Sequence, residues 1–190
     1  MKKEEMKTED VQTFAALGPE DTKKEAVSGK DIVYLFRPYA KRQQNAATVI
    51  AFQTEGERTI TKDADTTETK SGPIRTPGAT EIEISCTAVL SKKDTTYKDI
   101  LDAMLKDELV ECWRANLAET SDGSKFKGTY YQGYITEFSD SASSEDKVEV
   151  SITFGANGTG ADGEVTVPKE QQELANYVFA DTVKAGAKSV

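Results

Sequence analysis

The sequence predicts a mainly β protein, an antiparallel β-sandwich or half-barrel with one packed α-helix, a long loop and extended terminal arms. Several segments alternate apolar and polar residues with a period of two, which is typical of half-buried strands. Only one segment has the apolar spacing of an amphipathic helix. The chain of 190 residues has the length of one domain, and 30% of its residues are charged. This composition leaves polar segments outside a single core.

We expect three parts: an N-terminal arm (residues 1–29), a β-domain (30–179) and a C-terminal tail (180–190). The N-terminal arm is rich in charged residues and interrupted by Gly18-Pro19, a composition with little structure of its own. No apolar h-region follows its lysines, and no apolar run approaches the length of a membrane span. We therefore expect synthesis in the cytosol and no membrane association.

The β-domain begins at residue 30 with a strand that is apolar on both faces. Residues 32–37 carry this pattern, and Pro38 ends it. The segments 49–54 and 58–62 are predicted as two short strands on either side of Gly56.

The next segment, residues 63–80, is unsuited to a core. It reads DADTTETKSGPIRTPGAT, with two prolines, two glycines and only one strongly apolar residue, Ile74. Long loops in compact domains are commonly functional. The segment is therefore either an extended hairpin or a partner-binding loop, and we expect it and the termini to become ordered only on assembly, because they bury too little apolar area.

Two later segments, 81–90 and 147–154, have the clearest pattern of a strand with one buried face and one solvent-exposed, or wet, face. Each has an apolar face for the core and a face of acids and hydroxyls. The wet residues are Glu81, Glu83, Ser85 and Thr87 in the first segment and Glu149, Ser151 and Thr153 in the second.

The single convincing helix is predicted over residues 97–107. Its apolar residues fall at helical spacing, and Thr96 is the expected N-cap, with Asp99 at the third position. The apolar stripe consists of Tyr97, Ile100, Leu101, Met104, Leu105 and Leu109. This helix should lie on the sheet and close one end of it.

The remaining predicted strands are separated by segments rich in turn-forming residues. A strand containing Val110 to Trp113 precedes a turn at 121–124, and a long Tyr-rich strand follows at 126–138. In this strand, Gly128 and Gly133 are expected at bulges or close backbone approaches. A turn is expected at 139–144, and a short helix is expected to open at Pro168.

Composition excludes several kinds of chemistry. The chain has no histidine, which rules out Ser-His-Asp and Cys-His catalysis and imidazole-ligated zinc, and its two cysteines cannot form a zinc site. Cys86 and Cys112 are expected to be buried structural thiols. A net charge of −9 argues against tight nucleic-acid binding, but it is compatible with passive contact with DNA.

Two motifs only superficially resemble ligand sites. The glycines of 155–160 have the wrong spacing for a dinucleotide fingerprint and fit a turn. Asp63, Asp65 and Glu68 lack the third ligand and the turn glycine of a calcium loop. We therefore expect no enzymatic activity, no metal and no cofactor.

Four segments in combination resemble the major tail proteins of long-tailed, non-contractile bacteriophages of Gram-positive hosts. The likeness covers about residues 30–180. The segments are GKDIVYLFRPY at 29–39, IAFQTEGERTITKDADTTETKSGPIRTPG at 50–78, FKGTYYQGYITEF at 126–138 and EDKVEVSITFGANGTGADGEVTV at 145–167.

This resemblance implies a tail tube protein with the tail tube type of half-barrel, six copies per ring, and rings stacked into a hollow tube through which DNA is ejected. The expected partners are further copies, a tape-measure protein, tail terminator or distal tail proteins and, transiently, DNA in the lumen. The protein would be assembled in the host cytoplasm and reside in the virion. The alternatives are an adhesion or carbohydrate-binding β-sandwich and, less in keeping with the composition, a carboxylate hydrolase.

Within a tube, the wet strand faces are candidates for the channel lining. The candidate lumen-facing residues are Glu81, Glu83, Ser85, Thr87, Glu149, Ser151 and Thr153. The alternative is that these faces meet outer solvent. The loop supplies the candidate ring-stacking residues Asp63, Asp65, Glu68, Lys70 and Arg75.

Overall fold

The computed structural model describes residues 26–50, 52–91, 95–120, 124–144 and 146–175. Most of the predicted N-terminal arm, all of the predicted C-terminal tail, and the turn expected at 121–124 except for Ser124 lie outside these ranges. Within them, strands dominate, as the sequence predicts. The elements are η1 (Gly29–Asp31), β1 (Ile32–Pro38), η2 (Tyr39–Lys41), β2 (Thr48–Val49), β3 (Gln53–Thr69), β4 (Gly72–Val89), α1 (Thr96–Leu105), β5 (Val110–Thr120), β6 (Lys125–Ser141), β7 (Glu149–Ala156), β8 (Ala161–Thr166) and α2 (Lys169–Ala175).

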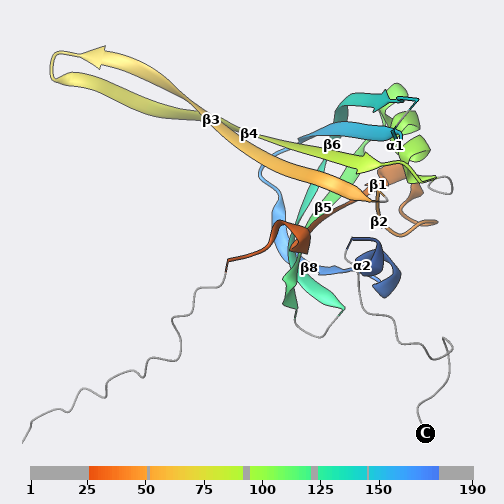
Figure 1. The fold of residues 1–190 in the computed structure, drawn as a ribbon. Coiled ribbons are helices and arrows are strands. Elements are labelled where there is room, and N and C mark those ends of the chain that lie inside the picture. The colour runs from red at the N-terminus through yellow and green to blue at the C-terminus, as the bar shows by residue number, and fades with distance from the viewer. Residues whose placement is uncertain (1–25, 51, 92–94, 121–123, 145, 176–190) are drawn as a thin grey trace, which may run out of the picture.

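All strands belong to one antiparallel sheet with the order β2-β1-β5-β6-β7-β4-β3, and β8 pairs with β6. The long strand β6 joins two halves of this sheet (Figure 1). Its N-terminal half pairs with β5 and β8, and from Gly133 onward it pairs with β7. The change of partner at Gly133 lets the sheet curl around a core, which confirms the mainly β, antiparallel prediction.

The main core fills the inside of the curled sheet. Tyr34 and Phe36 of β1 face Ile84 of β4 and Phe154 of β7 across it, and the Phe36 and Phe154 rings meet edge to face at 6.2 Å. Helix α1 buries Ile100 and Ala103 in the same cluster. Burial of this apolar surface is the main stabilising contribution to the fold.

A second, smaller core lies on the other face of β1 and β5. It contains Val33, Leu35 and Ala115, together with Phe126 of β6 and Val167 after β8. Strand β1 is thus apolar on both faces because it has a core on each side, as its sequence predicts.

A side-chain amide joins the two ends of the curled sheet. The Gln53 side chain accepts a hydrogen bond from the Tyr34 backbone N–H at 3.2 Å and donates one to the Tyr34 carbonyl at 2.6 Å. The Tyr34 ring lies against Gly56, where a Cβ atom would come within 2.6 Å of it. Gln53 therefore takes the place of a missing strand neighbour between β1 and β3.

The predicted loop 63–80 is wrong as a loop, and the extended-hairpin alternative is correct. β3 is one strand of 17 residues that runs through Gly56, rather than two short strands, and it pairs with β4 as far as the turn at Lys70 and Ser71. The composition suggested a loop because no core lies beside this segment. Two-stranded pairing joins the strands by backbone hydrogen bonds and does not require an apolar face.

Helix α1 differs from the prediction at both ends. It begins at Thr96, so Thr96 is not its N-cap, and the Thr96 hydroxyl instead meets that of Thr48 at 2.9 Å. It ends at Leu105, which is 73% exposed despite its place in the apolar stripe. The chain leaves the helix through Asp107, whose φ of 54° takes the backbone out of the helical path.

Two smaller boundaries also differ from the predictions. Strand β6 continues to Ser141, through the start of the expected turn, because β7 pairs with it as far as Glu149. Helix α2 begins at Lys169, and the Pro168 carbonyl accepts the first hydrogen bonds from Gln171 and Gln172.

The glycines expected at close backbone approaches in β6 are confirmed. A Cβ atom at Gly133 would lie 2.0 Å from the Gly155 carbonyl oxygen, and one at Gly128 would lie 2.5 Å from that of Arg114. Both obstacles are backbone atoms of neighbouring strands, which cannot rotate away. The bend of β6 therefore requires glycine at these positions.

We predict that Gly133→Ala destabilises the protein by at least about 2 kcal/mol, because overpacking against backbone forces strand displacement. Thermal unfolding should show a melting temperature lower by about 4–8 °C. Gly163→Ala is the control, since a Cβ atom there meets nothing within 4 Å. Equal melting temperatures for the two variants would contradict this account of the bend.

Candidate functional site

Four neighbouring strands, β3, β4, β7 and β6, share one continuous face of acids and hydroxyls. Residues directly opposite each other in an antiparallel pair lie on the same face. Ser85 pairs with Glu57 on one side and with Thr153 on the other, and Thr153 pairs in turn with Glu137. The acids and hydroxyls of this polar face are Glu55, Glu57, Thr59, Thr61, Glu81, Glu83, Ser85, Thr87, Glu137, Ser139, Ser141, Glu149, Ser151 and Thr153. The register also places Val89, Tyr134 and Gly155 on this face.

The structure brings all seven wet residues predicted from the sequence onto this face. It adds residues of β3 and β6 that the sequence analysis does not place there. The predicted break at Gly56 divides the alternation of β3 between two short strands, and Ser139 and Ser141 fall within the predicted turn. The alternation of Glu55, Glu57, Thr59 and Thr61 was the available signal. Whether the polar face is luminal stays a prediction.

Among the described residues, the acids of the polar face form no salt bridge, although Lys147 lines a surface pocket together with Glu149 at the margin of the face. The 14 acids and hydroxyls of the face are glutamates, serines and threonines. The basic residues of β3 point the other way: Arg58 donates a hydrogen bond to the Tyr131 hydroxyl at 3.0 Å. Between strands, the Thr87 and Ser151 hydroxyls meet at 3.0 Å. The face is therefore a hydroxyl surface with evenly spread negative charge.

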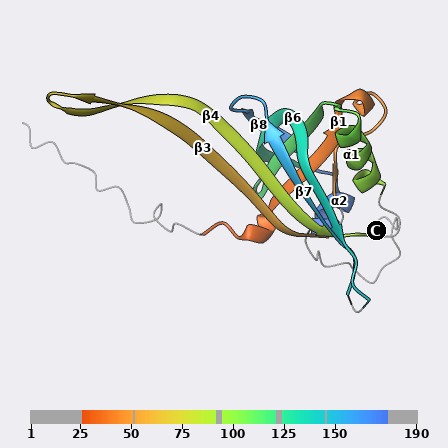
Figure 2. The same cartoon turned by 90° about the horizontal axis from the view of Figure 1, so that it is seen from above.

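The distal part of the β3–β4 hairpin, residues 62–80, forms an arm that projects from the body (Figures 1 and 2). β4 pairs with β7 only from Ile82 onward, so the arm strands pair only with each other. Eight residues of strand extend about 25 Å. Nearly every arm residue is exposed.

The predicted ring-stacking residues all lie on this arm, but they do not form one cluster. Asp63 lies at a register irregularity, and Lys70 lies in the turn. Asp65 is on one face of the arm, while Glu68 and Arg75 are on the other. The arm thus presents charge on both faces and at its tip.

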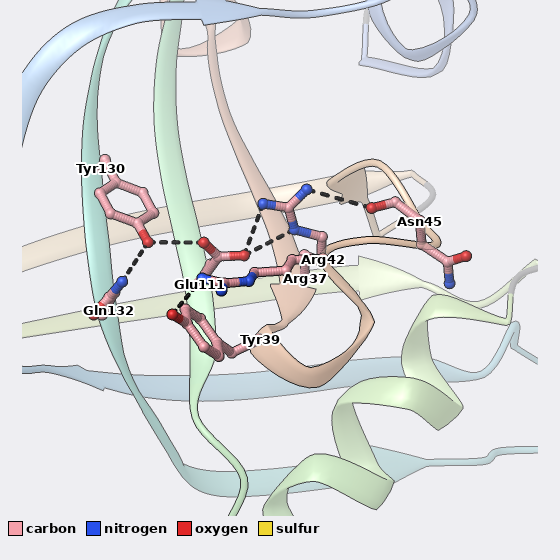
Figure 3. Close-up of polar contacts among 7 residues, drawn as sticks. All are labelled: Arg37, Tyr39, Arg42, Asn45, Glu111, Tyr130 and Gln132. Carbon is pink, nitrogen blue, oxygen red and sulfur yellow. Dashed lines mark hydrogen bonds and ion pairs between the residues drawn. The ribbon is translucent and has the colours of Figure 1, made fainter.

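A polar network on β1, β5 and β6 centres on Glu111, the buried charged residue of the described core (Figure 3). Arg37 contacts one Glu111 oxygen through Nε and Nη2, both at 2.8 Å, and the Tyr130 hydroxyl donates to the other oxygen at 2.8 Å. Gln132 donates to the Tyr130 hydroxyl at 2.6 Å, and the Arg37 guanidinium lies 5.0 Å from the Trp113 ring centre. Burial, together with Glu111, raises the pKa of Tyr130, although the Gln132 hydrogen bond opposes this shift.

The polar groups of this network are satisfied by one another. Both oxygens of the Glu111 carboxylate accept hydrogen bonds, and Arg37 also donates to the Asn45 carbonyl at 3.3 Å. Arg42 stacks on the Tyr39 ring and donates to its hydroxyl at the margin of the network (Figure 3). The sequence reading missed Glu111 because a single acid in a strand gives no sign of burial.

The cysteines are buried, as predicted. Burial raises the pKa of Cys86 to about 12 and that of Cys112 well above its ordinary range, so both thiols are protonated at neutral pH. Among the described residues, no three cysteine, aspartate or glutamate side chains are placed to hold a metal ion. In the same ranges, no helix is both long and apolar enough to cross a membrane.

The glycine-rich segment 155–160 is a turn, as predicted. Gly158 and Gly160 have φ values of 73° and 76°, in the region that favours glycine. Strand β8 follows the turn, whereas a phosphate-binding loop would be followed by a helix. The segment thus serves to reverse the chain.

The fold and these surfaces define a class of protein: a β subunit whose features suit binding to other subunits. It has a long open edge strand, a projecting arm and a charged sheet face. The chain belongs to the phage tail tube proteins, because it matches that family over residues 26–162. It is thus a structural component of a phage tail, and the predicted resemblance is confirmed.

Individual relatives agree with this assignment. The chain is 30% identical over 166 residues to a putative tail protein of Staphylococcus phage phiMR25, covering 84% of this chain and 85% of that protein. It is 28% identical over 147 residues to the tail tube protein of Bacillus phage SPP1, covering 76% of this chain and 54% of that protein. The chain thus spans about half the length of the SPP1 protein.

Solved structures confirm the tail tube fold. The SPP1 tail tube matches with a TM-score of 0.65 at 20% identity, covering 87% of this chain and 91% of that chain. The tail of a gene transfer agent particle, described with C6 symmetry, matches with a TM-score of 0.56 at 15% identity, covering 72% and 98%. These findings support a tail tube protein over the adhesion alternative.

We predict that stability falls above pH 9 because of Cys86. The pKa of Cys86 has its ordinary value of 9.0 in the unfolded chain and is about 12 in the folded protein. The stabilising contribution is complete below pH 9 and is lost as the pH rises toward 12, by at most about 1.4 kcal/mol per pH unit. Cys112 and Tyr130 act in the same direction.

Urea unfolding at pH 7.5, 9 and 10.5 measures this loss. The Cys86→Ala variant should show a shallower decline of unfolding free energy with pH than the wild type. Parallel declines for the two proteins would contradict the assignment.

Proposed function

We propose that this protein is the subunit of a hollow tail tube, built of stacked hexameric rings, through which DNA is ejected, and that it has no catalytic role. The observation that carries the proposal is the polar face of β3, β4, β7 and β6, bounded by two strand edges that lack a partner on one side. Membership of the tail tube family supports the tube. The C6 symmetry described for the gene transfer agent tail supports six subunits per ring.

The two edges suit a head-to-tail ring. Among the described strands, β3 pairs only with β4, and beyond Gly133 β6 pairs only with β7. Because four strands alternate in direction from β3 to β6, the β3 of a neighbouring subunit would run antiparallel to the β6 of the first. A closed ring of such contacts leaves no free edge in the polar sheet.

We place the polar face on the inside of this ring, as the channel lining. Duplex DNA carries about one negative charge per 1.7 Å of its axis, so a basic lining would hold it at many phosphates. Glutamates and hydroxyls repel it weakly and evenly, which favours sliding. Before ejection, the same channel would hold the tape-measure protein.

Replacing Glu81, Glu83 and Glu149 together with lysine is predicted to leave rings and tubes intact but to slow or stall genome ejection. The added charges would attract phosphates, most strongly at low salt, where screening is weakest. Ejection is measured as DNA release from purified particles triggered with receptor, at low and moderate salt.

The control for this triple variant changes three exposed acids away from the polar face, Asp102 of α1, Asp162 of β8 and Glu170 of α2, to lysine. This control has the same net charge and should eject normally. Normal ejection from well-formed triple-variant tails would place the polar face outside the channel.

We further propose that the arm ties one ring to the next. An isolated two-stranded hairpin is marginally stable in water, and this arm has little apolar surface of its own. A neighbouring subunit would supply the other half of its contacts. At the ends of the tube, where no further ring follows, a terminator or distal tail protein would take that place.

Deleting Asp65 to Pro73 should leave a folded protein that does not form long tubes. The deletion shortens the hairpin within its exposed part and leaves the core strands intact. Circular dichroism and thermal unfolding check the fold, and electron microscopy of the concentrated protein checks assembly. Long tubes from the deletion variant would exclude the arm from ring stacking.

A further inference from the structure

The two edges of the arm differ in what they offer to another strand. β4 carries Pro73 and Pro77 within the arm, whereas β3 has no proline along its 17 residues. Proline has no backbone N–H and cannot donate to a strand ladder. The arm thus has one edge interrupted by prolines and one open edge.

The pairing register shows which way the N–H groups point. Pro73 pairs with Glu68 and Pro77 with Ala64, and these pairs cannot exchange two hydrogen bonds. Thr69 and Gly72 flank the two-residue turn, and such a closing pair is hydrogen-bonded. Since the two kinds of pair alternate, residues 64, 66 and 68 of β3 direct their N–H groups away from β4.

The same alternation leaves the outer edge of β4 nearly without donors. Among its outward-facing residues from 73 to 77, only Arg75 has an N–H group. This edge begins at Thr80 and Glu81, beyond the last β4–β7 pair, Ile82 with Ala156. The prolines therefore prevent another strand from continuing the sheet where β7 ends, which is a common protection of natural edges.

We propose that the arm docks onto a second copy of this chain by backbone pairing along the outer edge of β3, and not along that of β4. This inference rests on the proposed ring-stacking role and specifies how the arm makes its contact. Ile74 is the strongly apolar side chain exposed in residues 62–80, so hydrophobic contact offers little. Backbone hydrogen bonds are what the arm can supply in quantity.

The fold favours a second copy of this chain as the partner that pairs with the arm. The open edge of the arm is continuous with the body edge of β3, where the ring contact is proposed. A subunit of the next ring that pairs with the arm would continue, along the same edge of β3, the ladder that the neighbour within the ring begins. An edge of this length would also invite non-specific pairing unless the assembled state covered it.

The test exploits a cross-strand pair, Thr66 and Arg75, whose N–H groups point outward on opposite edges. Thr66→Pro removes an outward donor from β3, and Arg75→Pro removes the equivalent donor from β4, while neither removes a β3–β4 hydrogen bond. Arg75→Ala controls for the lost charge. Assembly is measured by electron microscopy and sedimentation, and folding by thermal unfolding.

We expect Thr66→Pro to reduce the tube yield at least tenfold, and Arg75→Pro to assemble like Arg75→Ala. Tubes from Thr66→Pro at wild-type yield, or a loss confined to Arg75→Pro, would overturn the edge assignment and leave the proposed function standing. A wild-type protein that forms neither rings nor tubes would overturn the proposed function, and this inference with it.

Hydrogen exchange on the wild-type protein gives a test that needs no variant. On assembly, the N–H groups of Ala64, Thr66 and Glu68 should become protected at least tenfold more strongly, while that of Arg75 should keep its exchange rate. Protection of Arg75 without protection of the β3 residues would contradict the proposal.

Discussion

Backbone hydrogen bonding at the ends of one antiparallel sheet is the constraint on which the other features of this structure depend. An open sheet has two edges with unpaired N–H and C=O groups, and each needs a partner or water. At the seam between β1 and β3, the Gln53 amide bonds to both backbone groups of Tyr34, and the sheet curls around its core. In the proposed ring, the remaining outer edge of β3 pairs with the next subunit.

This arrangement separates the folding surfaces from the assembly surfaces. On β4 and β7, alternate residues either enter the core or join the polar face, so one pattern supplies both a stable interior and a charged exterior. The close approach of Gly133 to β7 allows β6 to change partners and connect the two halves of the sheet. Assembly contacts can therefore use the edge and the arm without disturbing the core.

The Arg37–Glu111 pair shows how this small domain fixes the geometry of β1 and β5. A buried ion pair gains little net stability, because desolvation offsets the attraction between its charges. Removing either partner would nevertheless leave a buried charge uncompensated. With the Tyr130 hydroxyl on the second oxygen and Trp113 against the guanidinium, the pair favours the register in which Arg37 lies opposite Glu111. Its contribution is therefore best described as specificity of alignment.

The sequence by itself determined the fold class, the core faces of β1, β4 and β7, the helix, and the acids and hydroxyls of two strands, because each depends on a local period. Tertiary structure decided the rest. It joined residues of β3 and β6 to the polar face, paired Glu111 with Arg37 over 74 positions, and turned a predicted loop into a hairpin arm. Register and pairing between distant segments depend on contacts that no local pattern records, and this is why the open edge of β3 emerged only from the fold.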